Sequence, residues 1–291
     1  MYIAALVALA VALAWPVPRL MAGFTAFRRA PRSALVVWQA TAVAAVLAAL
    51  FAAPAAIPLI VADEGRALDH IGLISVAGAI SGLMLARLLI VGHKVGTNLR
   101  AVRRKHRDLV DVLAVHGDTT VRVLEHPTPT AYCLPGSKRR VVLTQGTIDT
   151  LPGQELDAVL AHERAHLTAR HDLILEFFTV MHEAVPTFLR SDAALREVQL
   201  LIEVLADRAA VREVGALPTA RAIVMMAGGP KPVGSMALRE APSAAKVRIG
   251  LLGGRTIAGV DVTAASTVMY AFATSLVAAP VALLALSFNA L

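Results

Sequence analysis

Long apolar runs constrain this chain more than any other feature, because a lipid bilayer admits few backbone conformations. Residues 34–61, 71–91 and 263–290 are almost free of charged side chains, and residues 2–18 form a shorter run of the same kind. Each run is long enough to cross the hydrocarbon core as a helix. Within lipid, a helix satisfies its backbone hydrogen bonds internally. The sequence therefore predicts an α-helical multi-span membrane protein with four transmembrane helices.

Positive charges gather on one side of the predicted spans. Four arginines lie between the first two runs, and six lysines and arginines lie within 94–107, after the third run. Basic loops are retained in the cytoplasm. We therefore expect both termini to be extracytoplasmic and the region after the third run to be cytoplasmic. A basic stretch beside a span also attracts anionic headgroups, so the lipid bilayer is an expected partner.

This pattern divides the chain into three parts. Residues 1–92 are predicted to hold three transmembrane helices, residues 93–258 a cytoplasmic domain, and residues 259–291 the fourth helix. No basic segment precedes the first apolar run, which favours a span over a cleaved signal peptide. We expect a multi-pass protein of the cell membrane.

Composition excludes several other classes of protein. Hydrophobic residues make up 57% of the 291 residues, more than an ordinary soluble domain contains. The formal net charge is +7, but aromatic residues are only 4% and do not alternate with the basic stretches, so direct nucleic-acid binding is not expected. The single cysteine, Cys133, cannot form an intramolecular disulfide or a cysteine-based zinc site. It fits a reducing compartment.

The segment around His162, Glu163 and His166 is the main candidate for chemistry. Apolar spacing predicts a helix that begins near Pro152, and residues four apart leave the same face of a helix. Both imidazoles can then bind one Zn²⁺, while Glu163 can act as general base toward the activated water. We predict one zinc ion per chain. The buried face of this helix is expected to contain Leu156, Val159, Leu160 and Leu167.

Two histidines cannot hold zinc alone, so a third ligand is required. Asp172 occupies the position of the last ligand in HExxHxxGxxH enzymes, but Ala169 replaces the glycine that lets such a chain turn. His171 lies about 140° around the helix from His166, and we expect it at the surface or behind a ligand.

A later helix at 192–214 offers the favoured third ligand, Glu203. Asp207 shares its helix face, and apolar residues surround the pair. Glu203 can therefore bind the metal while Asp207 accepts a hydrogen bond from a ligand histidine, as a metal-bound imidazole normally requires.

These residues resemble the gluzincin metallopeptidases of membranes, both the HtpX and CAAX-protease group and the BlaR/MecR antibiotic-sensor group. The resemblance rests on His162-Glu163-x-x-His166 followed by Glu203-x-x-x-Asp207-Arg208. Residues 130–136 and 141–146 resemble the strand pair before the HExxH helix, and 246–249 resembles a short basic motif after the Glu helix. The layout of spans is more similar to the BlaR/MecR group. Those sensors carry a penicillin-binding domain after the last span, whereas this sequence stops there.

The resemblance implies a fold and roles for further residues. It implies an inserted α+β zincin domain whose edge strand, with Tyr132, Cys133 and Leu134, receives the substrate backbone as an added strand. The sequence itself does not identify the residue that stabilises the oxyanion, for which His171 and Arg208 are accessory candidates.

Two other segments have less specific patterns. Residues 173–189 are apolar but carry Glu176, His182 and Glu183, so we expect a core or membrane-surface helix and not a span. Proline and glycine within 228–254 predict a loop-rich return to the last span.

The function expected from these features is a membrane-anchored zinc-dependent endopeptidase. Its substrate would be a cytoplasmic or membrane-associated protein, and the BlaR/MecR resemblance implies a transcriptional repressor in a signalling pathway. The alternative is a non-catalytic membrane scaffold or signalling subunit that retains the zincin fold. The presence of Glu163 favours the enzyme, since a scaffold needs no base. The sequence does not determine the oligomeric state, and a homo-oligomer is one of the open possibilities.

Overall fold

The computed structural model describes residues 1–61, 70–116, 120–136, 138–227, 242–253, 256–257 and 260–289. The chain forms two compact units. Unit 1 comprises Met1–Lys94, Phe177–Glu197 and Ile257–Leu291, and unit 2 comprises Val95–Glu176 and Val198–Thr256. Residues 177–197 therefore group with the apolar helices and not with the domain around them in sequence.

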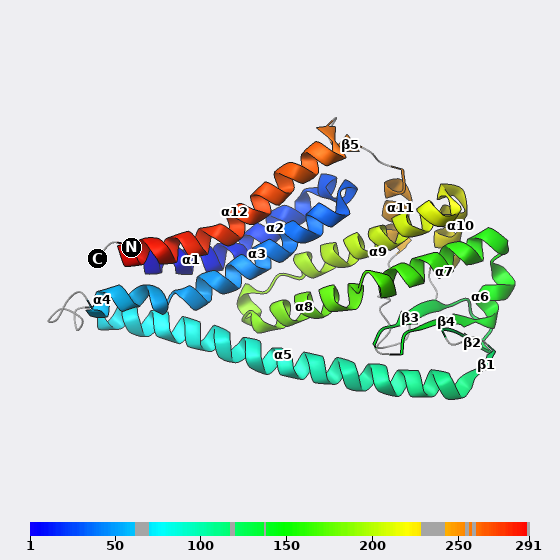
Figure 1. Ribbon diagram of the computed structural model, residues 1–291, viewed down its shortest axis with the longest axis horizontal. Helices are drawn as coiled ribbons and strands as arrows, with labels where there is room; N and C mark the ends of the chain where they lie inside the picture. Colours follow the sequence, from blue (N-terminus) through cyan, green and yellow to red (C-terminus); the bar gives the residue numbers. More distant parts are fainter. Residues whose placement is uncertain are drawn as a thin grey trace. The chain divides into compact units, whose positions relative to one another are not determined.

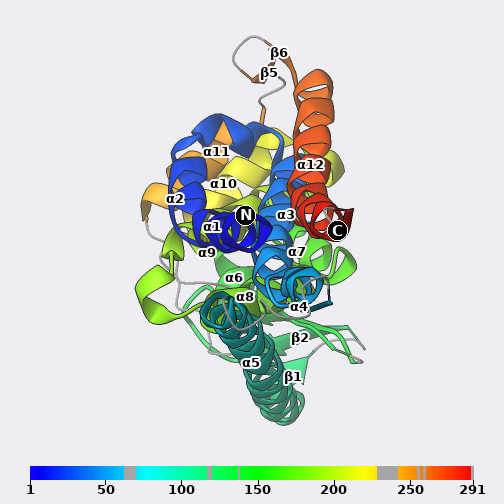
Figure 2. The same ribbon diagram turned by 90° about the vertical axis from the view of Figure 1, so that its left-hand side faces the viewer.

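Unit 1 is built from apolar helices. α3 (Pro31–Phe51) packs against α1 (Tyr2–Ala14) and α12 (Val262–Asn289), and the three lie side by side in Figures 1 and 2. Ala44 and Ala48 on α3 are fully buried. Small side chains such as these let helices in an apolar medium approach closely.

The described residues contain three or four candidate spans. α3, α12 and α5 (Ile71–Leu113) are each long and apolar enough to cross a membrane. A fourth crossing requires α1 and α2 (Pro16–Gly23), which meet at a bend of 40°, to act as one span. Pro16 lacks the N–H that would continue α1, which accounts for the bend.

Two predicted spans differ from the helices that form. The run 34–61 is not one helix: α3 ends at Phe51, and a 3₁₀ turn η2 (Pro54–Ala56) and a short α4 (Ile57–Val61) follow. Pro54 explains the break, because proline has no backbone N–H with which to continue the hydrogen bonds of α3. α5 instead continues far beyond the predicted end at Val91. The basic stretch is therefore helical.

Unit 2 contains a four-stranded sheet in the order β1-β2-β4-β3 (Figure 1). The predicted hairpin forms from β3 (Ala131–Leu134) and β4 (Arg140–Thr144), which are antiparallel. β2 (Val121–Leu124) runs parallel to β4 on its other side, and β1 (Ala114–His116) completes the sheet. Within the described residues β3 is thus an edge strand, as the resemblance implied, and pairs with β4 alone.

The helix α7 (Gly153–Thr168) packs on this sheet next to β3. Pro152 is its N-cap residue, which agrees with the predicted start. On the predicted face, Val159 and Leu167 are buried in the core, and Leu156 and Leu160 pack against it partly buried. The short α6 (Gln145–Thr150) joins β4 to this helix.

The remaining helices correct two expectations. The helix predicted over 173–189 is α8 (His171–Ala184), which stops before Pro186 because proline cannot continue a helix. Within 228–254, residues 242–251 are helical as α11 and not loop, while 228–241 lie outside the described residues. The other elements are α9 (Asp192–Val214), α10 (Ala216–Met226), η1 (Thr25–Arg29), η3 (Thr187–Leu189), β5 (Thr256–Ile257) and β6 (Val260–Asp261).

Candidate metal centre

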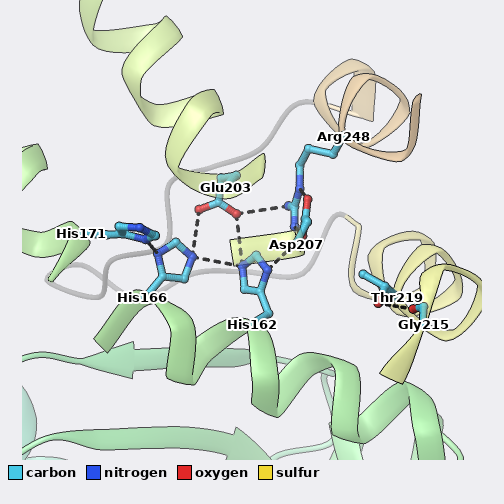
Figure 3. A network of polar contacts seen from close by, with 8 residues as sticks. All are labelled: His162, His166, His171, Glu203, Asp207, Gly215, Thr219 and Arg248. Carbon is cyan, nitrogen blue, oxygen red and sulfur yellow. Dashed lines mark hydrogen bonds and ion pairs between the residues drawn. The ribbon is translucent and has the colours of Figure 1, made fainter. Parts of the chain in front are cut away.

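Two histidines of α7 face each other at the centre of the site. His162 and His166 are one turn apart, and their Nε2 atoms lie 3.1 Å from each other (Figure 3). Two unprotonated ring nitrogens would repel at this distance. One of the two nitrogens must therefore carry a proton and donate it to the other, or both must bind a metal ion.

Glu203 approaches the same point from α9. Its carboxylate oxygens lie 3.4 Å from Nε2 of His162 and 3.5 Å from Nε2 of His166. One ligand atom from each of the three residues lies within 4.8 Å of the others. The structure thus brings together the three residues that the sequence predicted as zinc ligands, although α7 and α9 are far apart in the sequence.

The geometry of these atoms fits a zinc ion. Ligands about 2.0–2.1 Å from Zn²⁺ at tetrahedral angles stand about 3.3 Å apart. The two imidazole nitrogens are 3.1 Å apart, and the nearest Glu203 oxygen is 3.4 Å from His162 (Oε2) and 3.5 Å from His166 (Oε1). The Oε2 atom of Glu203 is buried, and the positively charged Arg248 lies 3.2 Å from it. A buried carboxylate is costly unless cations satisfy it, so a metal ion beside Arg248 would suit this position.

Asp207 and Arg248 form a buried pair behind His162. Asp207 accepts from Nδ1 of His162 at 2.9 Å, as predicted for a residue that orients a metal ligand. Arg248, on α11 (Pro242–Leu251), donates to both oxygens of Asp207 at 2.7 and 2.5 Å and lies 3.2 Å from Oε2 of Glu203. The basic motif at 246–249 was its only signal in the sequence.

His171 plays the corresponding part for His166. The two Nδ1 atoms are 2.9 Å apart, and His171 is only 2% exposed, so it does not lie at the surface. Arg170 has a positive φ of 52°, and this left-handed turn between α7 and α8 folds His171 back onto His166. Spacing along a continuous helix could not reveal this contact.

Asp172 is not part of the cluster formed by His162, His166 and Glu203. Its carboxylate lies 3.3 Å from Arg170 and 3.7 Å from Arg103. The turn that a glycine would make in the alternative motif falls at Arg170, since Ala169 has an ordinary φ of −82°. The geometry therefore favours Glu203 over Asp172 as third ligand.

The electrostatics of the cluster suit a cation at the shared point. Burial acts to lower the pKa of His162, but its hydrogen bonds to Asp207 and Glu203 outweigh burial and raise the pKa to about 9. Burial lowers the pKa of His166 well below its usual value. Burial acts to raise the pKa of Glu203, but the hydrogen bond with His162 and the nearby cations hold it well below the usual range. One positive charge is thus held among three ligand side chains.

A small pocket adjoins His162 and Glu163. Its volume is about 60 Å³, and its walls are mainly apolar side chains of α7 and α10. Glu163 is 8% exposed, which keeps its carboxylate beside the pocket and largely away from bulk water. The lining includes Arg248 but not Arg208, which is half-buried on another face of α9.

The edge strand β3 presents its backbone and not its side chains. Tyr132, Cys133 and Leu134 are all buried, at 2% exposure or less. Burial raises the pKa of the Tyr132 hydroxyl to about 12, and burial together with the Glu163 carboxylate raises the pKa of the Cys133 thiol well above its usual value. A neutral, buried thiol is a poor nucleophile, so Cys133 is excluded as the catalyst.

Comparison with known proteins gives a match over the region that builds this site. A model of peptidase family M48 matches residues 97–227. The chain is 30% identical over 156 residues to the plastoglobule-localized metallopeptidase 48, chloroplastic, of Arabidopsis thaliana, covering 48% of this chain and 45% of that protein. It is 41% identical over 70 residues to the mitochondrial metalloendopeptidase OMA1 of Schizosaccharomyces pombe, covering 22% of this chain and 20% of that protein. No solved structure matches significantly.

The chain spans less than half the length of these relatives. The matched residues include His162, His166, His171, Glu203 and Asp207 but end before Arg248. The matches support a metallopeptidase-type domain in a chain with apolar helices, and a metal, typically zinc, at its centre.

Proposed function

Since residues 97–227 are similar to the metallopeptidases of family M48, we propose that this chain is a membrane-anchored zinc endopeptidase. The observation that carries the proposal is the convergence of His162, His166 and Glu203 on one point beside Glu163. Asp207 and His171 hold the two imidazoles from behind. A structural zinc site would need a fourth protein ligand, whereas this set leaves a position open.

Each residue has a separate role in the proposed reaction. His162, His166 and Glu203 would hold Zn²⁺, which when bound supplies a Lewis acid that polarises the scissile carbonyl and acidifies water. Glu163 accepts the proton of the attacking water and then donates it to the nitrogen of the leaving amine. Asp207 and His171 each accept the Nδ1 proton of a ligand histidine, which leaves Nε2 unprotonated and aimed at the metal.

The substrate would bind as an extended segment along β3. Because the side chains of Tyr132, Cys133 and Leu134 are buried, contact with this edge would be made by main-chain hydrogen bonds. The adjoining pocket would take one small apolar side chain next to the scissile bond. Arg208 receives no catalytic role, since it does not line the pocket.

The proposed setting is a cell membrane with unit 2 in the cytoplasm and both termini outside, which the basic stretch beside the third span supports. A cytoplasmic or membrane-associated protein is the proposed substrate, and the BlaR/MecR resemblance makes a transcriptional repressor one such client. The alternative, a scaffold that binds zinc without turnover, predicts no loss of any function on removal of Glu163.

The test compares two glutamates of α7. Glu163→Gln should lower cleavage of fluorescent casein by purified protein by a factor of about 10² to 10⁴, the usual size of a general acid–base contribution, while zinc content stays unchanged. Glu155→Gln is the matched control, since Glu155 is also buried but pairs with Arg221 at the start of the helix. Equal activity of wild type and Glu163→Gln would reject the proposed catalyst.

The same pair of variants can identify the client. Proteomes of cells that carry Glu163→Gln should lack a cytoplasmic fragment that wild-type and Glu155→Gln cells contain. If all three proteomes agree, the scaffold alternative is favoured.

A further inference from the structure

Unit 1 contains a cavity that the proposed peptidase reaction does not use. Its volume is about 310 Å³, and it lies among α1, α2, α3, α5 and the segment from Phe178 in α8 to Leu195 in α9. Its walls are aliphatic and aromatic over most of their length, as with the buried side chains of Leu13, Trp38 and Phe178. An unfilled apolar void forfeits dispersion contacts, so a cavity that borders lipid favours an apolar occupant.

The length of the cavity matches one leaflet of a bilayer. Along α3 its lining extends from Trp38 to Ala49, which at about 1.5 Å per residue is roughly 16 Å. Half of the hydrocarbon core is about 15 Å. The cavity is thus long enough for much of one acyl chain that lies parallel to the helix.

One end of the cavity is basic. Ser81 of α5 donates to the carbonyl of Ala49 of α3 at 2.8 Å, so the two helices are in contact at this level. Ala49 is also the last residue of α3 that lines the cavity, so the apolar end of the cavity lies here. Arg87 lies almost two turns further along α5, toward the level of Trp38, and lines the other end together with Arg190.

These two guanidinium groups are oriented but not neutralised. Arg87 donates to the carbonyls of Glu183 and Ala184 at the C-terminal end of α8, and Arg190 donates to those of Glu183 and of Val185, the residue after the helix. Carbonyls at a helix end carry only partial negative charge. Within the part of the chain that the structure describes, no carboxylate forms an ion pair with either arginine.

The cavity is apolar, is about as long as one leaflet, and ends at two guanidinium groups. These three properties fit one class of ligand. We propose that this cavity binds one anionic phospholipid, with an acyl chain along α3 and its phosphate at Arg87 and Arg190. Guanidinium groups bind phosphate through short charge-assisted hydrogen bonds, and basic pockets between spans on the cytoplasmic side suit such headgroups. The site rests on insertion of unit 1 in a membrane but not on the peptidase activity.

The test measures lipid binding to the delipidated full-length protein in detergent. Native mass spectrometry would follow titrations with phosphatidylglycerol and phosphatidylcholine. We expect the wild type to bind phosphatidylglycerol with an affinity at least tenfold higher than that for phosphatidylcholine. A factor of this size corresponds to one charge-assisted hydrogen bond. Arg190→Gln keeps a donor for the α8 carbonyls but should remove this preference. Arg196→Gln is the matched control, because Arg196 is exposed and does not line the cavity.

A second pair of variants tests the cavity itself. Ala42→Phe fills the cavity and should weaken binding of both lipids, whereas Val43→Phe, on the next residue of α3 but outside the lining, should bind as wild type does. Equal retention of the two lipids by the wild type would overturn the headgroup assignment. If Ala42→Phe and Val43→Phe bind alike, the cavity is not the site. Inorganic phosphate is then added at the same concentration as the lipid. If it abolishes the preference for phosphatidylglycerol, the ligand is a free anion and the proposal is wrong.

Discussion

His171 offers the sharpest test of the metal centre, because its role is visible only in the folded chain. To bind metal through Nε2, His166 must carry its proton on Nδ1, and that proton needs an acceptor. Nδ1 of His171, 2.9 Å away, is the acceptor that the structure provides. Burial lowers the pKa of His171 to about 4, so its ring is neutral at physiological pH and can accept.

The perturbation is His171→Phe, which keeps an aromatic ring and removes the acceptor. A buried N–H without an acceptor costs about 1–3 kcal/mol, which corresponds to about 5- to 150-fold in an equilibrium constant. This range agrees with the loss of about 10- to 100-fold that follows removal of an outer partner of a metal-bound histidine. We therefore expect zinc to bind about 10- to 100-fold more weakly. His171→Gln, whose side-chain oxygen can accept, should recover part of the loss.

The assay is competition for zinc between the purified protein and a fluorescent chelator. Asp172→Asn is the matched control, since Asp172 is the neighbouring residue and equally buried but pairs with Arg103 and Arg170. Its zinc affinity should equal that of the wild type. Thermal unfolding of the metal-free proteins checks that the variants fold. Wild-type affinity in a folded His171→Phe protein would refute the role assigned here, and loss of zinc in Asp172→Asn alone would reopen Asp172 as the ligand.

Three further outcomes are expected. Zinc content of the purified protein should fall steeply for Glu203→Ala and less for Asp207→Ala, because the first removes a ligand and the second only an orienting partner; the reverse order would reject Glu203 as ligand. Asp111→Asn should lower the free energy of unfolding by about 1 kcal/mol or less at pH 7, since the hydrogen bond from Arg140 holds the pKa of the exposed Asp111 carboxyl below its usual value. That contribution is fully present above the carboxyl pKa of the unfolded chain, about 3.9, and is lost as pH falls through the lower pKa of the folded chain. The free energies of unfolding of wild type and variant should therefore converge in acid. A difference in chemical-denaturation midpoints that stays constant with pH would contradict this. Reporter fusions in the connection between α4 and α5 and after α11 should report opposite compartments, and matching signals would refute the proposed topology.

Local sequence patterns determined much of this protein. Helical periodicity and a spacing of four put His162 and His166 on one face of α7, and the same spacing put Glu203 and Asp207 on one face of α9. The hairpin of β3 and β4 was predictable for a similar reason, since two short β-rich segments flank a proline–glycine turn. Such features depend on interactions within a few residues, which a sequence displays directly.

Tertiary structure decided what distant segments do to one another. Arg248 holds Asp207 from 41 residues away, and no periodicity links α11 to α9. The left-handed residue Arg170 turns His171 back onto His166, a contact that extrapolation of the α7 helix had missed. Whether Glu203 or Asp172 meets the two histidines depends likewise on how α7, α8 and α9 pack. Packing sums many weak contacts between residues remote in sequence, so these distances exist only once the chain has folded.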